Sequence, residues 1–280
     1  MTTILDGKSL NESLGEKLKQ NIEELETKPH LAIIQIGHNK ESNTYIKYKK
    51  AFGEKIGAQV THLQFEDSVT EEKIIKEIEK LNKDQSTHGI IVQLPLPTQL
   101  NKEKIIDTIN PQKDVDGLTS INTTALLRGN PLITPATTRG IITMLKHYNI
   151  TIQGKHVVVV GRSNLVGKPT ALAMLNEGAA VTVCHSGTKD LAQETKLADI
   201  LIVAIGKPKL IGLEHVSKNQ IVIDVGINSQ IGLDKNTIGD VDFETVKDEV
   251  QAISPVPKGV GPMTVLSLFQ NLLDAYKTQI

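Results

Sequence analysis

A glycine-bounded turn from Gly161 to Gly167 has the residue types of a phosphate-binding site. The four valines Val157–Val160 precede the turn and are typical of a buried parallel strand. The apolar run Thr170–Leu175 follows it and predicts a helix. A strand, a glycine turn and a helix N-terminus present backbone N–H groups and the positive end of a helix dipole to a phosphate. The pattern therefore predicts a bound nucleotide.

Two kinds of phosphate site compete for this turn. The P-loop pattern has four residues between its glycines and a hydroxyl residue after its lysine. Here five residues separate the glycines, and Pro169 follows Lys168. The dinucleotide pattern has a second glycine where this chain has Ser163. Both patterns fail literally, and a plain tight turn is the third alternative.

The next predicted strand, Ala179–Val183, favours a dinucleotide and favours NADP over NAD. NAD-binding folds carry Asp or Glu at the end of this strand, where the carboxylate binds the ribose hydroxyls. This chain has Cys184, His185 and Ser186 there. Ser186 and Arg162, one of only three arginines, would suit a 2′-phosphate. An Arg162 that is merely solvated is the alternative.

Polar groups in the first half of the chain could carry out acid–base chemistry. Tyr45 and Lys49 are spaced i, i+4 and so share one face of a predicted helix. Gln93 ends a predicted strand, and Asp114 and Asp116 lie in one loop. Each also has a structural explanation. Tyr45 could cover the edge of the core, Gln93 could bond to loop backbone, and the aspartates could form an Asx turn.

Alternating strands and helices must position these groups. The predicted strands are 31–36, 60–65, 89–94, 156–160, 179–183, 200–204 and 221–225, and the predicted helices are 42–56, 71–81, 102–109, 139–148 and 263–276. A first helix begins with a capping box of Ser9 and Glu12. We expect an irregular loop over Pro255–Pro262. The alternation predicts parallel α/β sheets, which bind ligands beyond the carboxyl ends of their strands.

The composition is that of a globular protein with room for two domains. The chain has 280 residues, of which 39% are apolar and 22% charged. A net charge of −1 gives no electrostatic basis for binding nucleic acid or membranes. The single cysteine, Cys184, excludes an intrachain disulfide and is typical of a reducing compartment. With no signal-peptide pattern, we expect a cytoplasmic protein. The histidines lack metal-ligand spacing, so we expect no metal.

Six motifs occur in order along nearly the whole chain. They are Tyr45-x-x-x-Lys49, Val92-Gln-Leu-Pro-Leu-Pro97, Lys113-Asp-Val-Asp-Gly117, Gly161-Arg-Ser-x-x-Val-Gly167-x-Pro169, Ile223-Asp-Val-Gly-Ile-Asn228 and Pro255-Val-Pro-x-Gly-Val-Gly-Pro-Met-Thr264. In these motifs the chain resembles the bifunctional methylenetetrahydrofolate dehydrogenase/cyclohydrolase family. Several motifs in the right order are more specific than any single glycine pattern.

The resemblance implies two parallel-sheet α/β domains. Residues 1–140 and 262–280 would form a folate-binding catalytic domain, and residues 141–261 a Rossmann-like NADP-binding domain. The C-terminal helix would pack back on the first domain. Subunits would pair through their cofactor domains as a homodimer.

The same resemblance implies roles for individual residues. Lys49 would be the catalytic lysine, with Tyr45 and Gln93 as its partners, and Asp116 would hold the pterin ring. The other folate-binding residues would be Leu94, Pro95, Gly261, Pro262 and Thr264. NADP would be bound by Gly161, Arg162, Ser163, Val166, Gly167, His185, Ser186 and Ile227.

The implied activity belongs to one-carbon metabolism. The enzyme would oxidise 5,10-methylenetetrahydrofolate to the 5,10-methenyl compound by hydride transfer to NADP, then hydrolyse that product to 10-formyltetrahydrofolate in the same cleft. Burial beside a cationic substrate would favour a neutral Lys49, which we expect to act as the general acid and base. A P-loop NTPase and a non-catalytic NADP-sensing module are the alternatives.

Two places depart from the family pattern. The family usually has Pro-Cys-Thr-Pro before the connecting helix, where this chain has Pro135, Ala136, Thr137 and Thr138. The loop before the last helix usually has two glycines, and here the first is Lys258. We expect the chemistry to survive the loss of the thiol, and we expect Lys258 to place a cation near the folate entrance.

Overall fold

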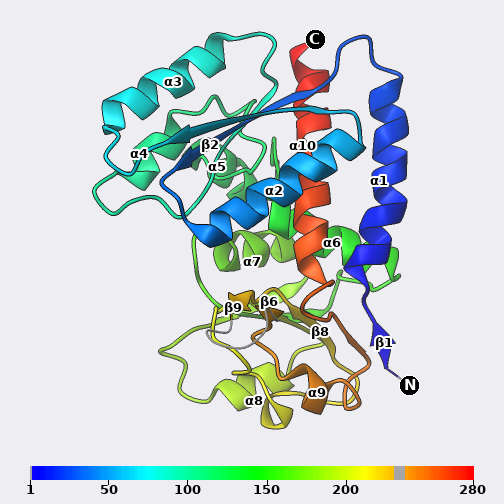
Figure 1. Ribbon diagram of the computed structural model, residues 1–280. Coiled ribbons are helices and arrows are strands. Elements are labelled where there is room, and N and C mark those ends of the chain that lie inside the picture. Colours follow the sequence, from blue (N-terminus) through cyan, green and yellow to red (C-terminus); the bar gives the residue numbers. More distant parts are fainter. Residues whose placement is uncertain (1, 230–236) are drawn as a thin grey trace. The chain divides into compact units, whose positions relative to one another are not determined.

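The computed structural model describes residues 2–229 and 237–280. The chain divides into two compact units, each with its own sheet (Figure 1). The three-strand unit comprises residues 12–136 and 265–280. The six-strand unit comprises the described residues up to 11 and those between 137 and 264.

The three-strand unit is built on a parallel sheet in the order β3-β2-β4. Its strands are β2 (His30–Ile36), β3 (Gln59–Phe65) and β4 (Gly89–Val92). β2 is the central strand, and its last six residues are buried. Ile34 pairs with Val92 in the register of β2 and β4. Residues that follow β2 and β4 therefore emerge together at the carboxyl edge of the sheet.

One face of this sheet packs against an amphipathic helix. The unit's helices include α2 (Lys40–Lys55), α3 (Glu71–Lys83), α4 (Lys102–Asp107) and α5 (Ser120–Leu127). α3 buries Ile74, Ile78 and Leu81 in a cluster with alternate residues of β2 and β4. The hydroxyl of Thr70 caps its first turn by accepting the N–H of Lys73.

The last helix, α10 (Val260–Gln279), completes the core of the three-strand unit from Val265 onward. Phe269 is fully buried, and its ring centroid lies 5.4 Å from that of Phe52 on α2. Asn271 Nδ2 donates to the carbonyl of Val115 at 2.8 Å. The prediction that the C-terminal helix packs back on the first domain is confirmed.

The six-strand unit contains a parallel sheet in the order β1-β11-β8-β7-β5-β6. Its strands are β1 (Thr3–Ile4), β5 (His156–Val160), β6 (Ala180–Cys184), β7 (Ile200–Val203), β8 (Ile221–Asp224) and β11 (Ala252–Ile253). A separate antiparallel pair joins β9 (Asn228–Ser229) to β10 (Thr237–Ile238). Its helices include α7 (Gly167–Asn176), α8 (Leu191–Lys196), α9 (Phe243–Val246) and a 3-10 turn at Leu213–His215. The helix α6 (Ala136–His147) belongs to this unit from Thr137 onward.

The central strands of this sheet are buried on both faces. Val158, Leu201 and Val222 face a cluster that includes Val246 of α9. α7 packs on β5 and β6 and buries Met174. Near-continuous apolar strands follow from this double coverage. The predicted architecture of two parallel-sheet α/β domains is confirmed.

The N-terminus differs from the prediction. β1 pairs with β11, so the first residues belong to the six-strand unit, whereas the sequence placed them in the first domain. The helix α1 (Gly7–Glu23) is capped by Asp6 Oδ1, which accepts the N–H groups of Lys8 and Ser9. The predicted capping box at Ser9 is therefore wrong, because the helix already begins at Gly7 and the carboxylate of Asp6 caps its first turn.

The start of α10 also differs from the prediction. The helix begins at Val260, within the stretch expected to be an irregular loop. Pro262 is its third residue, and a proline is tolerated in the first turn because the first N–H groups have no intrahelical partner. Among the described residues, no helix combines the length and the apolarity that crossing a membrane needs.

Candidate active site

Lys49 and Gln93 form the centre of the candidate active site. α2 carries Lys49, and Gln93 follows the last residue of β4. Lys49 Nζ donates to Gln93 Oε1 at 3.0 Å. Both side chains are only partly buried, so the pair remains accessible to a ligand. The two residues that sequence analysis placed on separate elements are in direct contact.

The orientation of the Gln93 amide is fixed from its other end. Gln93 Nε2 donates to the carbonyl of Leu94 at 2.9 Å, so its oxygen faces the lysine. Ser42 Oγ donates to the same carbonyl at 3.3 Å. Leu94 is joined to Pro95 by a cis peptide bond, and Pro95 is exposed. The Leu94 carbonyl therefore links the first turns of α2 to the loop after β4.

Ser42 is a site residue that the sequence analysis missed. It lies three residues before Tyr45 and seven before Lys49, so all three share one face of α2. That spacing is the signal by which it could have been found. Tyr45 is partly buried on this face.

The carboxylate of Asp116 interacts electrostatically with Lys49. Burial lowers the pKa of the Lys49 amine from its ordinary value, and the negative charge of Asp116 partly opposes this. Burial likewise raises the pKa of the Asp116 carboxyl, which Lys49 opposes and Asp114 reinforces. Desolvation thus favours the neutral form of both groups. A lowered pKa increases the fraction of the neutral amine, the form that can accept a proton.

Asp114 has a structural role, because its carboxylate accepts hydrogen bonds from the loop that contains it. It is 1% exposed and accepts the N–H groups of Gly117 and Thr119 at 3.0 and 2.8 Å. Asn122 Nδ2 also donates to it, at 2.9 Å. The Asx-turn explanation therefore holds for Asp114. Its hydrogen bonds fix the loop that presents Asp116.

The remaining predicted folate-binding residues begin α10 and fall in the six-strand unit. Gly261, Pro262 and Thr264 lie in its first five residues. The carbonyl of Pro262 accepts from Asn11 Nδ2 at 2.8 Å. Thr264 Oγ1 donates to Thr137 Oγ1 at 3.3 Å. A folate-binding role for these three residues stays a prediction.

The glycine turn after β5 has no room for side chains. Gly161 has φ +125°, and a Cβ there would lie 2.2 Å from the carbonyl oxygen of Ala204. A Cβ on Gly167, the first residue of α7, would lie 2.2 Å from the carbonyl oxygen of Gly161. The turn therefore closes tightly over the start of α7, as a phosphate site requires.

Ser163 caps α7 from within this turn. Its Oγ accepts the N–H groups of Val166 and Gly167 at 3.2 and 3.3 Å. The hydroxyl replaces the second glycine of the dinucleotide pattern and holds the donors that a phosphate would use. The literal mismatch with that pattern thus leaves the geometry intact.

Arg162 and Ser186 emerge from adjacent strands. Val160 pairs with Cys184 in the register of β5 and β6, and each predicted residue lies two positions further on. Both are exposed at the carboxyl edge of the sheet. His185 is held by Gly187, whose N–H donates to His185 Nδ1 at 3.0 Å. A cation and a hydroxyl are therefore exposed at the same edge of the sheet, and a 2′-phosphate-binding role for them stays a prediction.

Ile227 follows β8 at the same edge and is 46% exposed. The glycine turn, Arg162, Ser186 and Ile227 therefore all lie beyond the carboxyl ends of parallel strands, where nucleotides bind. The described residues include no group of three or more His, Cys, Asp or Glu that could hold a metal ion.

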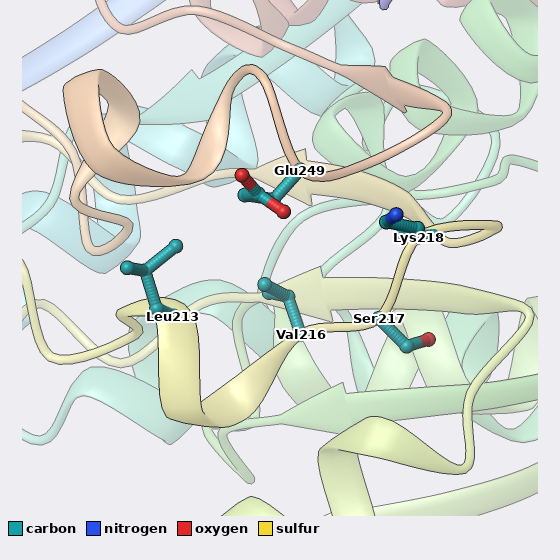
Figure 2. A pocket seen from close by; sticks show the side chains of 5 residues that line it. All are labelled: Leu213, Val216, Ser217, Lys218 and Glu249. Atoms are coloured by element: carbon teal, nitrogen blue, oxygen red, sulfur yellow. The ribbon is translucent and has the colours of Figure 1, made fainter.

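A surface cavity of about 450 Å³ lies elsewhere in the six-strand unit. It is lined by Leu213, Val216, Ser217, Lys218 and Glu249. Figure 2 shows Glu249 facing Leu213 and Val216 across the opening. None of the predicted site residues lines it, and it contains no buried polar group suited to chemistry.

Two family models together match most of the chain. The catalytic domain of tetrahydrofolate dehydrogenase/cyclohydrolase matches residues 5–116, and the NAD(P)-binding domain of the same enzymes matches residues 135–280. The chain belongs to the tetrahydrofolate dehydrogenase/cyclohydrolase family. The family predicted from the six motifs is confirmed.

Individual members of this family match the chain over its whole length. The bifunctional protein FolD of Agathobacter rectalis is 46% identical over 280 residues, which are 99% of this chain and all of that protein. The FolD crystal structure from Campylobacter jejuni is 40% identical and covers 100% of both chains with a TM-score of 0.96. The Trypanosoma brucei enzyme, solved with NADP and an inhibitor, is 33% identical over 99% of this chain and 98% of its own, with a TM-score of 0.95.

These comparisons also bear on activity and cofactor. The predicted pair of activities, dehydrogenase and cyclohydrolase, is confirmed. The predicted NADP cofactor is confirmed as well, because the matched domain binds NAD(P) and a solved family member holds NADP. The roles of individual residues are not settled by family membership and are argued below.

The departures from the family pattern lie at defined places in the fold. Ala136 is buried at the start of α6, and Thr138 Oγ1 lies 3.1 Å from Thr170 Oγ1 of α7. Lys258 adopts φ +87°, a backbone conformation that a glycine would adopt without strain. Its positive charge helps to lower the pKa of Asp6, the cap of α1.

Proposed function

We propose that this family member oxidises 5,10-methylenetetrahydrofolate with NADP and hydrolyses the methenyl product to 10-formyltetrahydrofolate, with Lys49 as the general acid and base of the second step. The observation that carries this proposal is the contact between Lys49 Nζ and Gln93 Oε1 at 3.0 Å, together with the electrostatic interaction of Lys49 with Asp116.

The oxidation depends on positioning more than on proton transfer. The substrate carries a one-carbon bridge between two nitrogens, and these nitrogens delocalise the cation that remains when hydride leaves the carbon. Bound NADP supplies the hydride acceptor. Alignment of donor and acceptor carbons supplies several kcal/mol of the barrier reduction. Lys49 and Gln93 would contribute by holding the folate in place.

The hydrolysis needs a base and then an acid. A water oxygen bonds to the cationic carbon while the neutral amine of Lys49 takes a proton from that water. The bond from this carbon to one nitrogen then breaks, and its electron pair and the proton held by the lysine go to that nitrogen. The hydroxyl oxygen forms the formyl C=O and releases its proton to solvent, so the hydrolysis releases one proton in total. The positive charge of the methenyl substrate disfavours a second positive charge on Lys49, so it lowers the pKa of the amine in the same direction as burial does. Gln93 orients the amine through its amide oxygen and adds no charge to the site.

Asp116 is suited to hold the pterin ring. A carboxylate can accept two N–H groups from an aminopyrimidinone, and such charge-assisted pairs are strong and directional. The three hydrogen bonds that Asp114 accepts fix the backbone next to it. Tyr45 lies one turn before Lys49 and would close the same face.

The residues around the glycine turn fit the cofactor. The N-terminus of α7 would face the pyrophosphate. The N–H groups of Val166 and Gly167, which now donate to Ser163 Oγ, would then be shared between that hydroxyl and the pyrophosphate. Arg162 and Ser186 would bind the 2′-phosphate and so favour NADP over NAD. Ile227 would contact the other end of the dinucleotide.

A single absorbance assay with methylenetetrahydrofolate and NADP⁺ tests the proposal. Reduced cofactor and 10-formyl product together support it. Reduced cofactor with accumulating methenyl compound would leave a dehydrogenase without an efficient cyclohydrolase. NADP binding without turnover would indicate a sensing module, and nucleotide hydrolysis with magnesium would indicate an NTPase.

We also propose a homodimer and a cytoplasmic location. β6 is an edge strand of its sheet, and Val183 on it and Leu175 on α7 are 39% and 56% exposed. An unpaired edge with apolar neighbours favours association with a second copy. Cys184 is a buried free thiol, as is typical of a reducing compartment. Light scattering on the purified protein checks the dimer.

A further inference from the structure

Asp240 is a fully buried carboxylate that binds two separate turns. Its Oδ2 accepts the N–H groups of Ile205 and Gly206 at 2.7 and 2.9 Å, in the turn after β7. Its Oδ1 accepts from Asn228 Nδ2 at 2.9 Å, in the first residue of β9, directly after the turn that follows β8. The residue is 0% exposed. One side chain therefore joins two turns that are far apart in sequence.

Asp224 holds Asp240 in place. It is the last residue of β8 and is 2% exposed. Its Oδ1 accepts the N–H groups of Gly226 and Asp240 at 2.9 and 3.1 Å, and its Oδ2 accepts that of Val241 at 2.9 Å. Its own N–H donates at 2.8 Å to Oγ of Ser254, the residue that follows β11. The two aspartates thus form one hydrogen-bonded unit.

The backbone around this pair leaves no space for other side chains. A Cβ on Gly226 would lie 2.3 Å from Asp240 Cγ. A Cβ on Gly239 would lie 1.9 Å from Asp224 Oδ2. Each carboxylate therefore fills the room that a glycine provides. A buried carboxylate is costly unless every oxygen is bonded, and here every oxygen is.

The order of the strands shows which part of the cofactor these turns face. The glycine turn follows β5, and the proposed 2′-phosphate site follows β6 on one side of it. β7 and β8 lie on the other side of β5. A dinucleotide whose pyrophosphate sits at the β5 turn must extend its second half over β7 and β8. Ile227, which is 46% exposed, lies in the turn after β8.

We propose that Asp240, held by Asp224, is a positioning residue for the nicotinamide half of NADP, because it fixes the turns at 205–206 and 226–228 on which that half rests. This inference rests on the proposed function. Neither carboxylate touches the cofactor. Both act through the backbone that they hold.

The test is to replace Asp240 by asparagine, which keeps the shape of the side chain. Asp240 receives donors on both oxygens, so an amide NH₂ must meet a donor on one side. We expect Asp240→Asn to weaken NADP binding by about 10- to 100-fold, measured by titration calorimetry. Hydrolysis of methenyltetrahydrofolate without NADP should stay close to the wild-type rate, because that step needs no cofactor.

A double variant provides the rescue. In Asp240→Asn/Asn228→Asp the donor and the acceptor of this contact change places, so the new amide donates to the new carboxylate. We expect NADP affinity to recover by about threefold or more relative to Asp240→Asn, but not fully, because the exchange also removes the bond from Asn228 Nδ2 to the carbonyl of Ile238 at 3.2 Å. The matched control is Asp199→Asn, because Asp199 Oδ2 accepts the N–H of His156 at 2.8 Å at the opposite edge of the same sheet. Its NADP affinity should not change.

Three outcomes would overturn the inference. They are an unchanged NADP affinity in a folded Asp240→Asn protein, an equal loss of cyclohydrolase activity, and a double variant that recovers nothing. If Asp240→Asn fails to fold, Asn228→Ala removes only the two hydrogen bonds that Asn228 Nδ2 donates, to Asp240 Oδ1 and to the carbonyl of Ile238, and an unchanged affinity in that variant also overturns it. A wild-type protein that binds no NADP would instead refute the proposed function.

Discussion

Lys49 Nζ lies 3.0 Å from Gln93 Oε1, and the amide of Gln93 is locked in this orientation by the carbonyl of Leu94. The contact joins the middle of α2 to the end of β4. An amide oxygen accepts a hydrogen bond from the lysine amine but carries no net charge, so it does not neutralise an ammonium group. The arrangement therefore orients Lys49 without raising its basicity as a carboxylate partner would.

Replacement of Lys49 by methionine should abolish most of the hydrolysis. We expect the rate of methenyltetrahydrofolate hydrolysis to fall about 10²- to 10⁴-fold, because the proton transfers lose their positioned group. The matched control is Lys50→Met, one position along the same helix and outside the contact with Gln93. Stopped-flow absorbance on the methenyl compound measures both. Wild-type hydrolysis by Lys49→Met would refute the assignment.

The hydrolysis should also depend on pH. Burial lowers the pKa of Lys49 below its ordinary 10.5, and its neutral form is the active base. The rate should therefore rise with pH and level off below 10.5. Asp116 opposes this lowering, so Asp116→Asn should move the inflection to still lower pH. Rate profiles at saturating substrate check this prediction, and an inflection that moves to higher pH in Asp116→Asn would contradict it.

Arg162→Ala should separate the two nicotinamide cofactors. The exposed guanidinium is placed to bind the 2′-phosphate, which only NADP carries. We expect the KM for NADP⁺ to rise about tenfold or more, since a charge-assisted hydrogen bond contributes roughly 1.5–3 kcal/mol. The KM for NAD⁺ should change little. Equal losses with both cofactors would remove Arg162 from this role.

Asp114→Ala should reduce stability, whereas Asp116→Ala should mainly reduce folate binding. Loss of the Asp114 carboxylate leaves buried donors at Gly117, Thr119 and Asn122 without their acceptor. We expect the free energy of unfolding to fall by about 3 kcal/mol. Urea unfolding of both variants, with folate titration, distinguishes them. A stable Asp114→Ala protein with weak folate binding would reverse the two assignments.

The stability of the protein should fall between mildly acidic and neutral pH through Asp224. Burial raises the pKa of this carboxyl to about 7, with Asp240 reinforcing the effect and three backbone N–H groups opposing it. The folded protein then holds a proton that the unfolded chain releases near pH 3.8. The stabilisation is complete below that value and is lost as the pH rises through about 7.

Asp224→Asn isolates this contribution. We expect the wild type to lose ~2 kcal/mol more than the variant between pH 5 and pH 7.5, because the variant has no proton to release there. Denaturant unfolding at both pH values provides the comparison. Parallel losses in the two proteins would show that Asp224 does not titrate in this range.

The strands of this fold were the easiest elements to predict. β5 is found at the predicted residues because its consecutive valines form a strand buried on both faces. β1 was missed because two residues, Thr3 and Ile4, form a strand only through pairing with β11. α10 begins earlier than predicted because glycine and proline were taken as loop signals in a first turn that tolerates both.

The site was predictable where family motifs carry it and not elsewhere. Lys49 and Gln93 meet as the resemblance implied. Asp114 and Asp116 stand two positions apart with the same side chain, and only the hydrogen bonds show that one supports the loop while the other faces Lys49. Asp240 went unnoticed because its partners at 205–206 and 228 are distant in sequence and no local pattern marks them.

The three-strand unit is built from two segments that are far apart in the sequence, and this affects how the protein folds during synthesis. The three-strand unit takes residues 12–136 and then 265–280, so its core stays incomplete until Phe269 and Leu272 have been translated. A ribosome-bound chain halted at residue 264 would leave the apolar residues that pack against α10 in the three-strand unit exposed to chaperones and proteases. Truncations near the C-terminus should therefore be far more harmful than their length suggests.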